Sequence, residues 1–84
     1  MSVMMASGMV PTVNLKKTGE NIMRIRKEAG ISVRDLQNMI GFSSPQAIYS
    51  WQNGSYLPTI DNLIILAAIF GTTLDEIVAV DAPT

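Results

Sequence analysis

The side chains best suited to chemistry in this 84-residue sequence are polar and uncharged, and they recur between positions 46 and 53. Gln46, Tyr49, Ser50 and Asn53 are separated by intervals of three and four, so a helix would present them on one face. Gln can pair bidentately with adenine in the major groove, Ser can bond to bases or phosphates, and Tyr can reach phosphate or stack. This outer stripe is therefore compatible with reading DNA. An ordinary solvated helix face has the same pattern.

The stripe belongs to the second of two short predicted helices around a turn at Gly41. Ser32 is placed to cap the first helix, and Gly41 ends it. Ser44 before Pro45 predicts the start of a second helix over about 45–52. The buried faces are expected to consist of Val33, Leu36, Met39 and Ile40 in the first helix and of Ala47, Ile48 and Trp51 in the second. This is the layout of a helix-turn-helix, which presents a few side chains to a DNA groove.

Phosphate contacts are expected beside this motif. The free N–H groups at the start of each helix can hold phosphates without a charged side chain. Arg34 falls in the first turn of the first helix, where the helix dipole disfavours a cation, and a bound phosphate would relieve that conflict. Arg24, Arg26 and Lys27 could flank the same edge from the preceding helix. A solvated surface arginine is the alternative interpretation of Arg34.

The remaining pattern predicts three more helices. One begins near Thr18, carries an apolar stripe of Ile22, Ile25 and Ala29, and ends at Gly30. Residues 60–70 follow a Thr59 cap and are apolar nearly all round, which is typical of a central, buried helix. A last short helix follows Thr73. We therefore expect one all-α domain of five helices over residues 18–78, with an N-terminal tail or arm at 1–17 and a C-terminal tail at 79–84. Residues 1–13 could dock on a partner subunit.

Charge is distributed unevenly along the chain. Residues 1–34 hold all six basic and two acidic residues, whereas residues 35–84 hold five acidic and no basic residues. The net charge of −1 argues against highly basic, sequence-indifferent DNA binding, but it leaves room for one positive edge. No apolar run approaches the roughly 20 residues of a membrane span. The composition fits a cytoplasmic protein.

Catalysis is not expected. The sequence contains no Cys and no His, which removes thiolate and imidazole nucleophiles, bases and metal ligands. Ser43 and Ser44 have no evident base, and the adjacent Asp75 and Glu76 suit the first turn of a helix. No glycine-rich phosphate loop is present. We expect no enzyme activity, no metal and no cofactor.

Several motifs together resemble the Cro/CI-type, or XRE, helix-turn-helix family of bacterial and phage regulators. The matching segments are IMRIRKEAGIS (22–32), L-x-x-x-x-G (36–41), S-x-Q-A-I-x-x-W (44–51), NG (53–54) and LPTIDNLIILAAIFGTTLDEI (57–77). The resemblance implies a compact five-helix, lambda repressor-like domain that is usually dimeric on operator DNA.

The resemblance also implies roles for individual residues. Base-facing positions are Ser44, Gln46, Tyr49 and Ser50, and backbone-facing positions are Arg26, Val33, Arg34 and Asn53. Three positions depart from the family pattern. Val33 stands where Gln is common, Ser50 where Lys or Arg is common, and Gln52 where an acidic residue usually faces the arginine equivalent to Arg26. Arg26 and Gln52 would then share a hydrogen bond with a neutral acceptor, or Arg26 would be free for phosphate.

Two functions follow from these observations. The first is a sequence-specific transcriptional regulator, a repressor that binds a palindromic operator as a homodimer, with half-sites about 10 bp apart. The second is a helix-turn-helix used for protein contact, such as an antitoxin-like partner or a module without DNA affinity. The acidic C-terminal half, Val33 and Ser50 favour the second.

Overall fold

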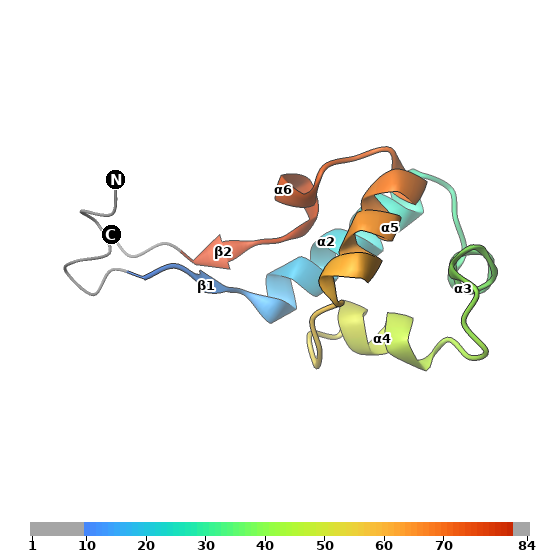
Figure 1. Ribbon diagram of the computed structural model, residues 1–84, viewed down its shortest axis with the longest axis horizontal. Coiled ribbons are helices and arrows are strands. Elements are labelled where there is room, and N and C mark those ends of the chain that lie inside the picture. The colour runs from blue at the N-terminus through green and yellow to red at the C-terminus, as the bar shows by residue number, and fades with distance from the viewer. Residues whose placement is uncertain (1–9, 82–84) are drawn as a thin grey trace.

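Five helices follow one another in residues 10–81, the part of the chain that this computed structural model describes (Figure 1). The elements are β1 (Thr12–Val13), α2 (Leu15–Glu28), α3 (Val33–Ile40), α4 (Gln46–Gln52), α5 (Ile60–Phe70), α6 (Leu74–Ile77) and β2 (Val80–Asp81). The all-α class and the five predicted helices are confirmed. Among these residues, none of the helices has the length and apolar character needed to cross a membrane.

Three predicted helix caps are present, because a Ser or Thr hydroxyl at the N-cap accepts an N–H of the first turn. The caps are Ser32 with the N–H of Asp35 at 3.0 Å, Thr59 with Asn62 at 3.3 Å and Thr73 with Glu76 at 3.3 Å. Gly41 ends α3 with a φ of 93°, a conformation that glycine adopts without strain. Ser32 and Gly41 thus mark the two ends of α3, the first helix of the motif.

The expected start of the first helix at Thr18 is wrong. Asn14 caps α2 instead, since its side-chain oxygen accepts the N–H of Lys17 at 2.9 Å. Thr18 lies inside the helix, is 1% exposed, and accepts the N–H of Ala79 at 2.9 Å through its hydroxyl. The hydroxyl that suggested a cap therefore holds the C-terminal segment against α2.

The expected serine cap of α4 is also wrong. Pro45 occupies the N-cap position, no side chain caps the helix, and Gln46 is its first residue. Ser44 lies one residue before the cap position, so its hydroxyl does not reach the free N–H groups of the first turn.

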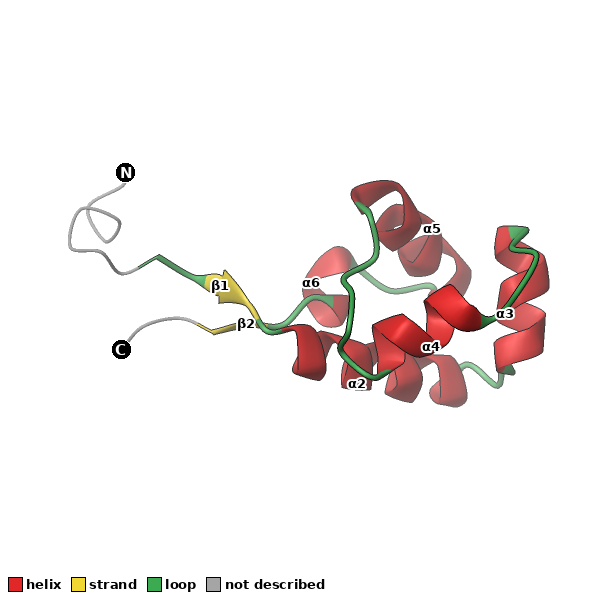
Figure 2. Ribbon diagram, turned by 90° about the horizontal axis from the view of Figure 1, so that it is seen from below, coloured by secondary structure: helices red, strands yellow, loops and turns green. Residues whose placement is uncertain are grey.

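Two segments expected as tails pair with each other. Thr12 pairs with Asp81 and Val13 with Val80, which makes β1 and β2 an antiparallel ribbon that projects from the helical body (Figure 2). Asn14 fastens its base, because its N–H donates to the carbonyl of Ala79 at 2.8 Å. The proposed partner-docking role of residues 1–13 falls largely outside the described residues.

The core is made by one or two side chains from each helix. The buried apolar residues are Ile22, Ile25, Leu36, Ile48, Trp51, Leu63, Leu66 and Ile77. Phe42 meets the ring of Trp51 edge-on, with ring centroids 5.7 Å apart. This shared core fixes α4 against the rest of the domain.

Three core expectations are wrong. Met39 is 56% exposed because Leu36 and Ile40 occupy the inner side of α3. Ala29 is exposed because α2 ends there. α5 is not buried all round, since Ile60 and Ile64 remain 60% and 55% exposed.

Gly19 sets how closely α2 and α4 approach. A Cβ built on Gly19 would lie 2.2 Å from the carbonyl oxygen of Trp51 and 2.7 Å from that of Gln52. Both obstacles are backbone atoms that cannot rotate away. Only glycine therefore fits at this crossing, which holds the end of α4 on α2.

Candidate nucleic-acid interface

α4 presents two of the predicted base-facing side chains to solvent. Gln46 is exposed, Tyr49 is 52% exposed, and neither side chain hydrogen-bonds to another residue in 10–81. Ile48 and Trp51 anchor the opposite side of the helix in the core. The amide and the phenol therefore project from a firmly held helix with their hydrogen-bonding groups free. This arrangement suits contact with base edges and phosphates.

The two predicted serines differ in placement. Ser44 is exposed in the turn just before α4, and Ser50 is half-buried. The backbone of Ser50 closes the end of the helix, because its carbonyl accepts the N–H groups of Ser55 at 2.9 Å and Tyr56 at 3.3 Å. Ser44 is therefore exposed near Gln46 at the start of α4, whereas Ser50 is partly buried.

Asn53 shapes the loop that leaves α4. Its side-chain oxygen accepts the N–H of Ser55 at 2.9 Å and the hydroxyl of Ser55 at 2.6 Å. The residue is exposed, and its side-chain N–H groups make no bond within residues 10–81. Asn53 thus combines a turn-forming acceptor with a free donor at the end of α4.

Arg26 joins three parts of the motif. Its Nε donates to the side-chain oxygen of Gln52 at the end of α4, at 2.9 Å. One terminal nitrogen donates to the carbonyl of Ile31, just before α3, also at 2.9 Å. Arg26 is 8% exposed, and both acceptors are neutral. The predicted bond with Gln52 is therefore present, and the positive charge has no acidic partner among the described residues.

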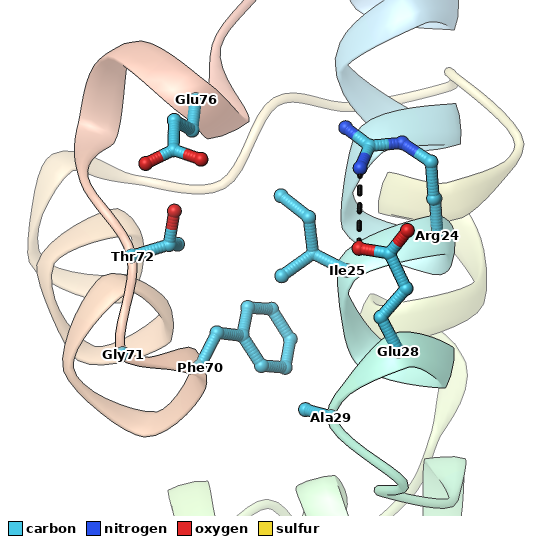
Figure 3. A pocket seen from close by; sticks show the side chains of 8 residues that line it. All are labelled: Arg24, Ile25, Glu28, Ala29, Phe70, Gly71, Thr72 and Glu76. Atoms are coloured by element: carbon cyan, nitrogen blue, oxygen red, sulfur yellow. Dashed lines mark hydrogen bonds and ion pairs between the residues drawn. The ribbon is translucent and has the colours of Figure 1, made fainter.

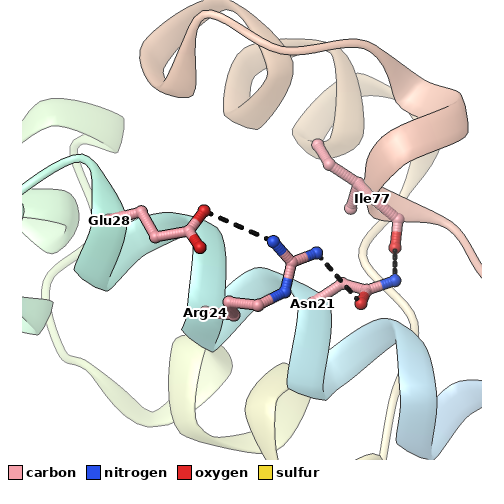
Figure 4. A network of polar contacts seen from close by, with 4 residues as sticks. All are labelled: Asn21, Arg24, Glu28 and Ile77. Carbon is pink, nitrogen blue, oxygen red and sulfur yellow. Dashed lines mark hydrogen bonds and ion pairs between the residues drawn. The ribbon is translucent and has the colours of Figure 1, made fainter.

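Arg24 lies on a different side of α2. Its guanidinium contacts Glu28 at 3.3 Å and the side-chain oxygen of Asn21 at 3.4 Å, and the Asn21 amide donates to the carbonyl of Ile77 at 3.1 Å (Figure 4). This network faces α6. The structure therefore separates Arg24 from the contacts of Arg26 with α3 and α4.

The structure also places the other residues that were predicted to contact the DNA backbone. Lys27 and Arg34 are exposed, at the end of α2 and the start of α3. The side chain of Val33 packs against the core, so only its backbone could face a phosphate. Two exposed cations and the junction at Arg26 thus lie on the elements that frame the motif.

A separate hollow of about 270 Å³ lies between the ends of α2 and α5 and the start of α6 (Figure 3). Arg24, Glu28 and Glu76 stand around it, and no lining residue comes from α3 or α4. The Thr72 hydroxyl is buried there and has no hydrogen-bond partner among residues 10–81. Within residues 10–81, no group of three acidic, His or Cys side chains could hold a metal ion.

Two residues that position the helices were not predicted from the sequence. Gly19 lies within a helical pattern, and its role depends on α4 crossing α2 at that point. Asn14 lies before the expected start of the helix. Asparagine is a favoured N-cap residue, so the sequence did contain a signal for a helix that starts here.

Comparisons with known proteins agree with this geometry. The sequence matches the helix-turn-helix family over residues 22–77. No curated protein sequence matches it. Similar solved structures include the DNA-binding domain of BldD, with a TM-score of 0.68 and 21% identity over 79% of this chain and 94% of that one.

Two further structures are similar to this chain. The S. venezulae BldD DNA-binding domain gives a TM-score of 0.67 at 21% identity, covering 79% of this chain and 97% of its own. The restriction-modification controller protein C.AhdI from Aeromonas hydrophila gives 0.67 at 21% identity, covering 75% and 94%. These likenesses confirm the fold.

Proposed function

The chain belongs to the Cro/CI-type, or XRE, helix-turn-helix family, and from this premise we propose that it is a sequence-specific DNA-binding transcriptional regulator. It acts as a cytoplasmic repressor that binds a palindromic operator as a homodimer, with α4 in the major groove. The family assignment also confirms that the chain is not an enzyme.

The exposed face of α4 is the observation that carries the proposal. Gln46 and Tyr49 are free to bond outward, while Ile48 and Trp51 fix the helix in the core. Gln46 is the first residue of α4, and the start of a recognition helix is the part that contacts base edges. The neighbours described as DNA-binding domains support the same use of the fold.

Charge makes the proposed binding modest in strength. Arg26, Lys27 and Arg34 frame the motif, whereas Arg24 is engaged on the α6 side. Three neutralised phosphates per subunit would give a log–log dependence of affinity on salt of roughly −3. A single subunit with so few cations would bind weakly, which is why we propose that two subunits bind one site.

Selection from a pool of random duplexes at a stated salt concentration tests this proposal. We expect enrichment of a palindrome with half-sites about 10 bp apart. Gln46→Ala should weaken binding to that site by about 5- to 100-fold while leaving the circular dichroism spectrum and thermal unfolding unchanged. Lys17→Ala is a control, because Lys17 is exposed in the first turn of α2, outside the motif. A pool without an enriched palindrome would contradict the proposal.

A second candidate function is a protein-interaction module. The side chain of Val33 packs inward where the family often presents a DNA-binding glutamine, and residues 35–84 carry no basic residue. In this alternative, the exposed surfaces bind another protein and DNA affinity is absent. Gln46→Ala separates the two functions, since a protein-interaction module would keep its activity in an assay without DNA.

A further inference from the structure

Lys16, at the start of α2, lies beside the loop that leaves α4 (Figure 1). Gly54 belongs to this loop, and a Cβ built on it would lie 2.9 Å from the Cα of Lys16 and 3.4 Å from its Cβ. The backbone of the loop is therefore in contact with the first turn of α2, and Gly54 passes it with a φ of 82°. The side chain of Lys16 begins at this contact and is exposed.

The turn of α2 places Lys16 on the side of α4 and Lys17 away from it. Successive residues on a helix are about 100° apart, so Lys16 lies about 60° around the helix from Gly19 and Lys17 about 160°. Gly19 faces α4, since a Cβ built on it would lie 2.2 Å from the carbonyl oxygen of Trp51. Of the two exposed lysines in the first turn, Lys16 is therefore the one next to the end of α4.

Asn53 brings the exposed stripe of α4 to the same place. Gln46 and Asn53 are seven residues apart, so they point in directions that differ by only about 20° around the helix. Asn53 keeps helical backbone angles, with a φ of −88° and a ψ of 0°. It is exposed, and its side-chain N–H groups make no bond within residues 10–81. Because Asn53 directly precedes Gly54, this free amide lies one residue from the contact with Lys16.

The charge of Lys16 is available to a ligand. Within the part of the chain that the structure describes, the one ion pair joins Arg24 and Glu28, so Glu20, one turn after Lys16, does not pair with it. The helix dipole disfavours a cation in the first turn, and Lys16 therefore does not stabilise α2 electrostatically. Its ammonium group has three donors on a flexible stem, which suits a phosphate oxygen.

We infer that Lys16 and Asn53 together hold one phosphate of the DNA backbone at the end of α4. The inference rests on the proposed function and deepens it, because it adds a fourth cation from outside the motif. Lys16 and Arg26 are ten residues apart on α2, about 15 Å along the helix, so one phosphate cannot bridge them. With a fourth phosphate, the salt slope of the wild type should be about 1 steeper than three cations alone would give.

Substitution of Lys16 on the selected duplex tests this contact. Lys16→Ala should weaken binding about 3- to 10-fold and reduce the salt slope by about 1. Lys17→Ala is the matched control, because Lys17 is also an exposed lysine in the first turn of α2 but lies on another side. It should bind within about 2-fold of the wild type. A phosphate contact carries no sequence information, so Lys16→Ala should weaken binding to a scrambled duplex by the same factor, unlike Gln46→Ala.

Asn53→Asp tests the second member of the contact. Asp keeps the oxygen that accepts the N–H of Ser55, so the turn and the thermal unfolding should be preserved. The carboxylate replaces the free N–H donors and repels a phosphate, which should weaken binding at least about 10-fold. It would also neutralise Lys16. Adding Lys16→Ala should therefore cost less than it does in the wild type, and equal losses in both backgrounds would separate the two residues and overturn the shared contact.

Duplexes with one neutral methylphosphonate at a time locate the phosphate. At the contacted position, the wild type and Lys16→Ala should bind equally, whereas at every other position Lys16→Ala should remain weaker. A wild type that binds DNA would overturn the inference alone if Lys16→Ala bound as well as Lys17→Ala, or if no single replacement removed the difference between wild type and Lys16→Ala. A wild type that selects no duplex would overturn the proposed function and the Lys16 contact together, so the two failures are distinguishable.

Discussion

Arg26 donates from Nε to the side-chain oxygen of Gln52 at 2.9 Å, which places a neutral amide where an acidic partner would neutralise the guanidinium. Arg26 is 8% exposed, and its other acceptor, the carbonyl of Ile31, is also neutral. Within residues 10–81 the one ion pair is that of Arg24 with Glu28. The charge of Arg26 therefore stays uncompensated at the junction of α2, α3 and α4, beside the proposed DNA-binding face.

Gln52→Glu should raise stability and lower DNA affinity together. A carboxylate would supply an ionic partner for the buried guanidinium and raise the free energy of unfolding by about 1 kcal/mol. The same carboxylate would cancel the charge offered to a phosphate, so the salt slope of DNA binding should fall by about 1. Chemical denaturation and a salt titration on the selected duplex measure the two effects.

Gln52→Leu provides the control for this substitution. It keeps the approximate volume but removes the acceptor for Arg26, and should lower the free energy of unfolding by about 1–3 kcal/mol. Higher stability in both variants would show that side-chain packing, not charge pairing, controls this contact. Unchanged DNA affinity and salt slope in Gln52→Glu would remove Arg26 from the proposed phosphate contacts.

Gly19→Ala should destabilise the domain, although Ala favours helices by about 1 kcal/mol over Gly. The added Cβ would lie 2.2 Å from the carbonyl oxygen of Trp51, so α4 must move away from α2. We expect a loss of at least about 2 kcal/mol in the free energy of unfolding, measured by denaturant titration. Glu20→Ala, at the next and exposed position, should change stability by less than about 0.5 kcal/mol. A Gly19→Ala domain as stable as the wild type would contradict the close crossing.

Gly19 illustrates where inference from the sequence ends. Caps such as Ser32 and Thr73 act within four residues, so the sequence predicts them. The crossing at Gly19 and the β1–β2 ribbon depend on segments far apart in the chain, and no local pattern encodes them. The helix start predicted at Thr18 is wrong for this reason, because the partner of its hydroxyl lies 61 residues away.

The candidate site also combines features that local sequence predicts with features that depend on distant segments. The helical period correctly placed Gln46 and Tyr49 outside and Ile48 inside α4. The same period places Arg24 and Arg26 on different sides of α2, since side chains two positions apart on a helix point in directions about 200° apart. The different positions of these two arginines could therefore be predicted from the sequence. The partial burial of Ser50 depends on how the chain returns after α4, and its carbonyl bonds with that return segment.

Two threonines whose hydroxyl groups are buried should respond oppositely to the same substitution. Thr18→Val removes the acceptor of the Ala79 N–H, leaves that part-buried donor unpaired, and should cost about 1–2 kcal/mol of stability. Thr72→Val removes a buried hydroxyl that has no partner, and should leave stability unchanged or raise it by about 1 kcal/mol. Each variant is the other's control in thermal unfolding. A loss of similar size in both would contradict the assignment of an unpaired hydroxyl to Thr72.

Asn14→Asp should keep the cap of α2 but create a repulsion between residue 14 and Asp81. Asp is as good an N-cap as Asn and its charge suits the helix dipole, so the cap to Lys17 should persist. The Asn14 amide, however, now donates to the carboxylate of Asp81 at 3.2 and 3.3 Å, and the variant would place two carboxylates there. We expect slightly lower stability at neutral pH and low salt, with recovery at high salt because screening weakens the repulsion. Adding Asp81→Asn should restore stability at low salt by removing the second charge. Equal thermal unfolding of the single and double variants at low salt would show that the ribbon contact does not hold the two ends together in solution.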